Sequence, residues 1–150
     1  MESKKKYVLD ANIFLEYIYG RTLQDLAQKL LIQAITGEIE IFIPSLALDE
    51  ISEVLCGNMD NIEQIASHLH YIEKLIYEEI IKVFVPNTKV RLKAIEIARY
   101  GSKKGGYPDF TDSLYHALAI LQQAIFITND KKHLAKAKDF GHIQLLSAAI

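Results

Sequence analysis

Short apolar runs alternate with longer segments of helical periodicity along the chain. Buried strands are indicated by the apolar runs at 7–9, 39–43, 81–85, 125–128 and 143–146. Helices are indicated where apolar residues recur every three or four positions, at 13–18, 23–34, 47–55, 62–76, 90–98, 114–121 and 134–138. Because the connections between strands have room for helices, this order predicts an α/β fold with a mainly parallel central sheet covered on both faces.

Length and composition limit the class of protein. With 150 residues, of which 50% are hydrophobic, the chain is expected to form a single domain over residues 1–150. A net charge of −2 argues against a polycationic nucleic-acid coat, so any nucleic-acid contact is expected to be a local patch. No apolar run reaches the roughly 20 residues of a membrane span, and the first residues contain no apolar signal segment. A cytoplasmic protein without membrane contact is therefore expected.

The cysteine and histidine residues do not indicate a metal site. One cysteine, Cys56, excludes an internal disulfide and a multi-cysteine site, and its place at the end of an apolar helical pattern predicts that it is buried. His68 and His70 lie two residues apart in a predicted helix, so they do not share a face.

Four acidic residues occupy positions where an α/β fold gathers functional groups. Asp10 and Asp130 each follow an apolar strand, and Asp112 begins the helix that enters the strand before Asp130. Glu50 lies on the helix that follows the second strand. Because the carboxyl ends of parallel strands share one edge of the sheet, these four side chains are expected to converge there. Each also has a purely structural explanation, such as a favourable charge at a helix N-terminus or a turn residue.

Helical geometry distinguishes Glu50 from its acidic neighbours. At about 100° per residue, Glu50 falls about 40° outside the apolar arc of its helix, whereas Asp49 and Glu53 each lie about 100° from the nearest edge. Glu50 is therefore predicted at the margin of the core, and the other two in solvent. An ordinary boundary glutamate is the alternative.

A cluster of carboxylates favours one kind of chemistry. Carboxylates brought close together raise one another's pKa values, so such a cluster normally requires a cation. Oxygen ligands without a cysteine set or a histidine pair favour Mg²⁺ or Mn²⁺. Such an ion activates a water molecule and offsets charge on a phosphoryl oxygen, which makes phosphodiester hydrolysis the expected reaction.

Four stretches of the chain resemble the PIN-domain family, and within it the VapC-type toxin ribonucleases of toxin–antitoxin pairs. They are VLDANIFL at 8–15, IPSLALDEI at 43–51, FTDSLYHALA at 110–119 and IFITND at 125–130. The resemblance implies a three-layer α/β/α fold and a metal-dependent endoribonuclease directed at single-stranded RNA. A cognate antitoxin and a homodimer are further expectations that come from the resemblance alone.

The resemblance also assigns residues. It places the family's catalytic and metal-binding acids at Asp10, Glu50, Asp112 and Asp130. It further implies that three neighbours support the metal by hydrogen bonding, namely Asn12, Thr128 and Asn129.

Other residues near these acids have two explanations each. The lysines predicted to contact RNA flank the acidic positions and are Lys103, Lys104, Lys131 and Lys132. Tyr107 or Tyr115 is a candidate for stacking a base, with solubilising lysines and core-facing tyrosines as the alternatives. Asp109 is interpreted as a helix cap, with a position on the same face as Asp112 as the alternative. His116 is interpreted as a histidine on the helix surface, with orientation of a carboxylate or of a substrate phosphate as the alternative.

Two other functions compete with the nuclease. The first is a catalytically inactive PIN-fold module that binds RNA or acts as a scaffold, which the presence of all four acids disfavours. The second is an aspartyl-phosphate phosphatase or a receiver-like domain that uses Asp10. Such a phosphatase is expected to carry a second aspartate two residues later, where this chain has Asn12.

Overall fold

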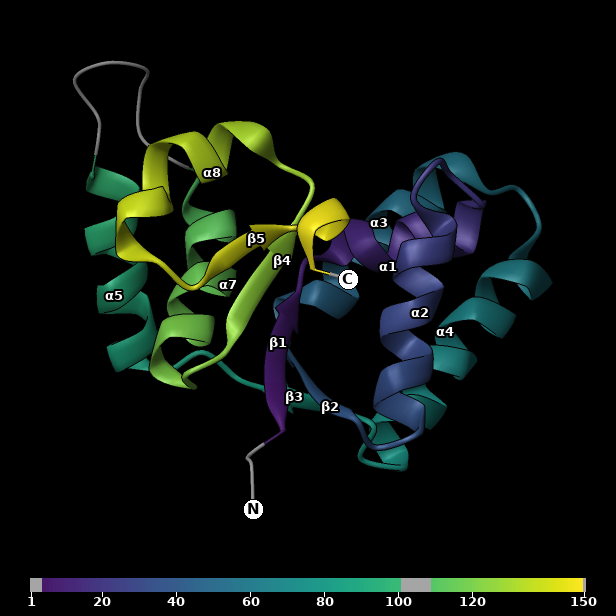
Figure 1. Ribbon diagram of the computed structural model, residues 1–150. Coiled ribbons are helices and arrows are strands. Elements are labelled where there is room, and N and C mark those ends of the chain that lie inside the picture. Colours follow the sequence, from purple (N-terminus) through teal and green to yellow (C-terminus); the bar gives the residue numbers. More distant parts are fainter. Residues whose placement is uncertain (1–3, 101–108, 150) are drawn as a thin grey trace.

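The computed structural model describes residues 4–100 and 109–149, and its centre is a five-stranded parallel sheet (Figure 1). The strands are β1 (Lys5–Leu9), β2 (Ile39–Pro44), β3 (Ile81–Phe84), β4 (Ile125–Thr128) and β5 (Ile143–Leu145). Their order across the sheet is β3-β2-β1-β4-β5, and every neighbouring pair is parallel. The prediction of a mainly parallel sheet is confirmed.

The order of the strands reverses at the boundary between β1 and β4. From β1 the chain moves outward through β2 to β3, and it then returns to the other side of β1. Tyr7 of β1 pairs with Ile41 of β2 on one side and with Ile125 of β4 on the other. The carboxyl ends of β1 and β4 therefore lie together at the position where open α/β sheets place their functional groups.

Helices cover both faces of the sheet and complete three layers (Figure 1). One face carries α1 (Ala11–Tyr19), α2 (Gln24–Ile35), α3 (Leu46–Asn58) and α4 (Ile62–Tyr77). The other face carries α5 (Thr88–Arg99), α7 (Phe110–Leu121) and α8 (Lys131–Ala137). Two short 3₁₀ turns follow, η1 (Lys138–Phe140) and η2 (Leu146–Ala148).

The core follows this layering. The inner strands and the helices α1 to α3 supply most of a main hydrophobic cluster, in which Val8, Leu9, Ile41 and Ile43 have no exposed surface. A second cluster joins α5, α7 and α8 through residues such as Ala94. Helix α7 takes part in both clusters, so it is packed on more than one side.

Most predicted elements are found within one or two residues of their expected bounds. Helix α8 is an exception, because it begins at Lys131 rather than at 134. Its earlier start is capped by Asp130, which accepts hydrogen bonds from the first free backbone N–H groups. The prediction for Cys56 is wrong. Cys56 is exposed on α3, since it follows the buried Leu55 and points away from the sheet.

The structure also bears on the membrane prediction. Within residues 4–100 and 109–149, no helix combines the length and the apolar character that a membrane span requires. The predicted RNA contacts Lys103 and Lys104, and the candidate stacking residue Tyr107, lie outside the described residues.

Candidate metal centre at the ends of β1 and β4

Asp10 lies between β1 and α1 as the N-cap of the helix, and its carboxylate is held from two directions. One oxygen, Oδ1, accepts a hydrogen bond from the backbone N–H of Asn12 at 3.1 Å, which caps α1. The other, Oδ2, accepts a hydrogen bond from the hydroxyl of Thr128 at 3.0 Å. The residue is only 3% exposed. The strand end and the helix start therefore fix this acid in a buried position.

Thr128 connects Asp10 to Asp130. Its buried hydroxyl donates to Asp10 and accepts a hydrogen bond from the backbone N–H of Asp130 at 3.0 Å. The Oδ1 atom of Asp130 in turn accepts from the backbone N–H groups of Lys132 at 2.9 Å and His133 at 3.1 Å, which caps α8. One threonine thus sets the relative position of the acids that follow two neighbouring strands.

Asp112 lies in the first turn of α7, where a negative charge is favourable. Asp109 caps this helix by accepting a hydrogen bond from the backbone N–H of Thr111 at 2.7 Å, which confirms its predicted role. The carboxyl group of Asp112 is hydrogen-bonded to that of Asp130. Two carboxyl groups form such a bond when one of them retains its proton.

Glu50 is half-buried on α3, and its Oε1 atom accepts a hydrogen bond from the hydroxyl of Tyr115 at 2.5 Å. Its neighbours Asp49 and Glu53 are exposed, as the helical wheel predicts. Tyr115 has no exposed surface and stacks on Phe126 of β4, with ring centroids 5.6 Å apart. The aromatic core of the protein therefore orients this glutamate.

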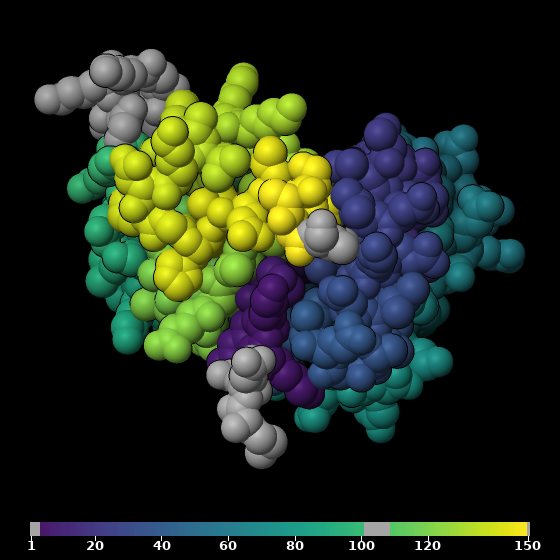
Figure 2. Space-filling model, in the orientation of Figure 1, coloured from purple at the N-terminus to yellow at the C-terminus, as the bar shows by residue number. Residues whose placement is uncertain are grey.

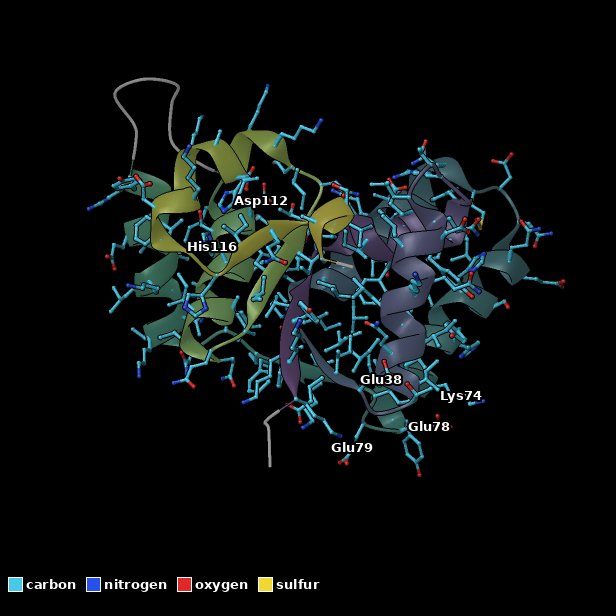
Figure 3. The ribbon with its side chains drawn as sticks, in the orientation of Figure 1. Glu38, Lys74, Glu78, Glu79, Asp112 and His116 are labelled. Atoms are coloured by element: carbon cyan, nitrogen blue, oxygen red, sulfur yellow. The ribbon has the colours of Figure 1, made fainter. Side chains whose placement is uncertain are left out.

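A cleft of about 140 Å³ brings three of the acids together. Its lining residues are Asp10, Ala11, Asn12, Leu15, Glu50, Glu53, Val54 and Asp112. Asp130 lies beside this group, since it is hydrogen-bonded to Asp112 and acts electrostatically on Asp10. In Figure 2 the outline of the molecule is indented between the yellow-green C-terminal part and the purple-blue N-terminal helices. Figure 3 shows Asp112 on the C-terminal half of the molecule, far from Glu38, Glu78 and Glu79 at the opposite end.

Burial and mutual repulsion hold three of these acids toward their neutral forms. Burial raises the pKa of Asp10, and the charge of Asp130 adds to the effect. Burial likewise raises the pKa of Glu50, although the hydrogen bond from Tyr115 opposes it. Burial, the charge of Asp10 and the hydrogen bond with Asp130 raise the pKa of Asp112 to about 8. A cation placed among these groups would favour their charged forms.

Asp130 behaves in the opposite way. Burial alone would raise its pKa, but hydrogen bonds from the backbone N–H of His133, from Asp112 and from the backbone N–H of Lys132 outweigh burial and lower the pKa. In the pair, Asp130 is therefore the charged partner and Asp112 is the partner that holds the proton.

The donor set fits a hard divalent cation in its chemistry. All four acids offer oxygen atoms, and repulsion among them is what a cation would relieve. As the side chains stand, no three histidine, cysteine or acidic side chains in the described part of the chain are arranged to hold a metal ion. A cation among these acids would compete with the proton that the raised pKa of Asp112 retains.

The remaining predicted site residues lie around the acids. Asn12 is one of the residues that line the cleft, and Asn129 is half-buried in the connection between β4 and α8. Lys131 and Lys132 are exposed in the first turn of α8, directly after Asp130.

Sequence reasoning missed two features of the site. Tyr115 is buried, so the core-facing alternative is confirmed, and its hydroxyl also donates a hydrogen bond to Glu50. Its position three residues after Asp112 places both residues on one face of the helix. The prediction for His116 is wrong. It has no exposed surface, because α7 is covered on more than one side and all residues from 113 to 119 are buried.

Comparisons with known proteins agree with this geometry. The sequence matches the PIN domain family over residues 7–139, so the chain belongs to that family. Its resemblance to VapC-type proteins is confirmed at the level of the fold. Comparison with curated proteins finds no similar sequence.

Three similar structures illustrate the shared fold. DNA-bound VapBC from Salmonella typhimurium has a TM-score of 0.70 and 15% identity, covering 95% of this chain and 98% of that one. VapBC2 from Rickettsia felis, bound to a promoter DNA fragment, has a TM-score of 0.69 and 19% identity, covering 93% and 98%. VapC20 from Mycobacterium tuberculosis, described as a toxin that cleaves the sarcin-ricin loop, has a TM-score of 0.63 and 14% identity, covering 86% and 93%.

Proposed function

We propose that this chain is a single-domain, metal-dependent endoribonuclease that cleaves phosphodiester bonds in single-stranded RNA. The observation that carries the proposal is the meeting of four acids from separate segments at the edge where the strand order reverses. In this proposal Mg²⁺ or Mn²⁺ is held by Asp10, Glu50, Asp112 and Asp130. Membership in the PIN domain family supports the reaction class.

The protein's own groups have distinct tasks in this proposal. Thr128 orients Asp10 and favours its charged form by donating a hydrogen bond to it, which opposes the effect of burial on the pKa. Tyr115 orients Glu50 toward the cleft. Asp112 releases its proton when the cation binds, which makes binding weaker at low pH. The bound cation supplies an activated water molecule and offsets charge on the phosphoryl group.

Lys131 and Lys132 are proposed to hold the RNA backbone. Both are exposed and directly follow the capping residue Asp130. Positive charge beside a metal centre attracts phosphates, and a local patch of this kind is compatible with the net charge of −2.

The biological setting is proposed by analogy with the similar structures. Several of these are VapBC pairs, and one is described as a toxin–antitoxin complex from Klebsiella pneumoniae. We propose that this chain is likewise the toxin of such a pair, acting in the cytoplasm, with an antitoxin partner and a homodimeric form. Light scattering of the purified chain and co-purification with its genomic neighbour would test the last two points.

The decisive experiment is cleavage of a structured RNA pool by the purified protein, with Mg²⁺ or Mn²⁺ or with EDTA. The variants are Asp10→Asn and, as a matched control, Asp49→Asn, which changes an exposed aspartate on α3. We expect metal-dependent cuts in single-stranded regions that Asp10→Asn abolishes and Asp49→Asn retains.

Other outcomes would reject the nuclease. A folded protein that binds RNA without cutting it would favour the alternative, an inactive PIN-fold binding or scaffold module. One observation favours that alternative. Within the described residues, no three acidic, histidine or cysteine side chains are arranged to hold a metal ion. Full activity of Asp10→Asn would remove this residue from the site.

A further inference from the structure

Two histidines lie in the interior beneath the acids and contact each other. His116 of α7 is 0% exposed and His133 of α8 is 2% exposed. The Nδ1 atom of His116 and the Nε2 atom of His133 are 3.1 Å apart. The Nε2 atom of His116 lies 2.7 Å from the carbonyl oxygen of Gly141, in the connection to β5. Neither ring has a task in the chemistry proposed above.

The hydrogen bonds determine where the protons are. A carbonyl oxygen only accepts, so Nε2 of His116 carries a proton and donates it to Gly141. Both rings are buried, and their nitrogen atoms have no acidic hydrogen-bond partner, which favours the neutral form of each ring. The Nδ1 atom of a neutral His116 is then an acceptor, and Nε2 of His133 must be the donor.

This directed chain joins the two elements that carry the interacting acids. The backbone N–H of His133 donates to Oδ1 of Asp130 at 3.1 Å. His116 lies one turn after Asp112 on the same helix, as Figure 3 shows. The hydrogen bonds therefore link α8, through the two rings, to α7, which carries Asp112, and to Gly141.

Both histidine rings contact β4, the strand that follows α7 and precedes α8 in the sequence. Phe126 of β4 has its ring centroid 6.0 Å from that of His116 and 5.9 Å from that of His133. Phe126 also stacks on Tyr115, the partner of Glu50. A change in the histidine pair would therefore reach the acids through rigid, buried contacts.

We propose that His116 and His133 are positioning residues, whose single directed hydrogen bond fixes α8 against α7 and so sets the separation of Asp130 and Asp112. The pair contacts neither substrate nor metal. For its effect on metal binding, this inference rests on the proposed function. Substitution of groups that orient metal ligands typically weakens metal binding by about 10- to 100-fold.

The test compares two substitutions of one residue. His133→Gln keeps an N–H donor at nearly the position of the ring Nε2, whereas His133→Leu keeps apolar volume without a donor. His70→Gln is the control, because His70 is an exposed histidine on α4. The readouts are the Mn²⁺ concentration that gives half of the maximal thermal stabilisation, the hydrogen-exchange rates of the amides of Lys132 and His133, and the ¹⁵N shifts of the rings.

The expected results separate positioning from stability. His133→Leu should raise the half-saturating Mn²⁺ concentration by about 10-fold or more, and His133→Gln by less than about 3-fold. His70→Gln should leave it unchanged. In the wild-type protein, both buried rings should show a protonated Nε2 and an unprotonated Nδ1. Amide exchange at the cap of α8 should be faster in His133→Leu than in His133→Gln.

Specific results would overturn the inference. If His133→Leu lowers the melting temperature but leaves the half-saturating Mn²⁺ concentration unchanged, the pair is only structural. The opposite protonation pattern in either ring would break the directed chain, and this measurement stands even where His133→Leu does not fold. If the wild-type protein binds no Mn²⁺, the proposed function fails; equal exchange rates in both variants would then refute the positioning role separately.

Discussion

Replacement of Asp112 by asparagine should stabilise the metal-free protein at alkaline pH. The side chain of Asp112 holds a proton because it is buried beside the charges of Asp10 and Asp130, and its pKa is about 8. Asparagine has the shape of the protonated acid and retains a donor for Asp130. It therefore removes the cost of ionisation while preserving the hydrogen bond.

The sign and size of the effect follow from the two pKa values. The unfolded chain releases this proton near the ordinary pKa of an aspartate, 3.8, and the folded protein releases it near 8. The folded state thus holds more protons between these values, so the stability is fully present below about pH 4 and is lost as the pH rises through 8. The difference between these two pKa values corresponds to roughly 6 kcal/mol, which solvent near this incompletely buried group reduces to about 2–3 kcal/mol.

Urea denaturation in EDTA at pH 5 and pH 8 measures this difference. We expect Asp112→Asn to have the higher free energy of unfolding at both pH values, by a smaller margin at pH 5 and by about 2–3 kcal/mol at pH 8. In thermal unfolding at pH 8 this is about 6–9 °C for a chain of this size. Asp49→Asn, at an exposed site, should show no comparable change between the two pH values.

A variant that is no more stable than the wild-type protein at pH 8 would refute the reasoning, since Asp112 would then be charged without cost. The comparison between variants matters because other groups also titrate. The pKa values of Asp10 and Glu50 are also raised, so these groups, like Asp112, lower the free energy of unfolding as the pH rises. Asp130, with a lowered pKa, contributes stability that is lost as the pH falls.

Three further substitutions test other contacts of the site. Thr128→Val keeps the volume but removes the donor to Asp10 and the acceptor for Asp130, so it should lower the free energy of unfolding by about 1–3 kcal/mol in urea titrations; an unchanged midpoint would contradict the contact. Tyr115→Phe removes the hydrogen bond that lowers the pKa of Glu50, so the pH profile of metal binding should move to higher pH, and an unmoved profile would exclude this role. Lys132→Ala should weaken the binding of non-cleavable RNA and make the plot of log binding constant against log salt concentration less steep by about one. A slope equal to that of the wild-type protein would show that Lys132 contacts no phosphate.

The sequence by itself determined the order of the elements and singled out the four acids as candidate site residues. Apolar runs and helical periods are local properties, and a strand that ends at Asp10 or Asp130 does so wherever the strand is placed in the sheet. The same locality explains why the helical wheel distinguished Glu50 from the exposed Asp49 and Glu53.

Only the tertiary structure decided which of these groups touch. The placement of β4 beside β1 brings Thr128 to Asp10, and the packing of α7 against the sheet brings Tyr115 to Glu50. His116 was predicted at the surface because a helical pattern records one buried face. A second face is buried only when other elements pack on it, and here α5 and α8 do so on α7. Burial of this kind depends on residues distant in the sequence, so no local pattern contains it.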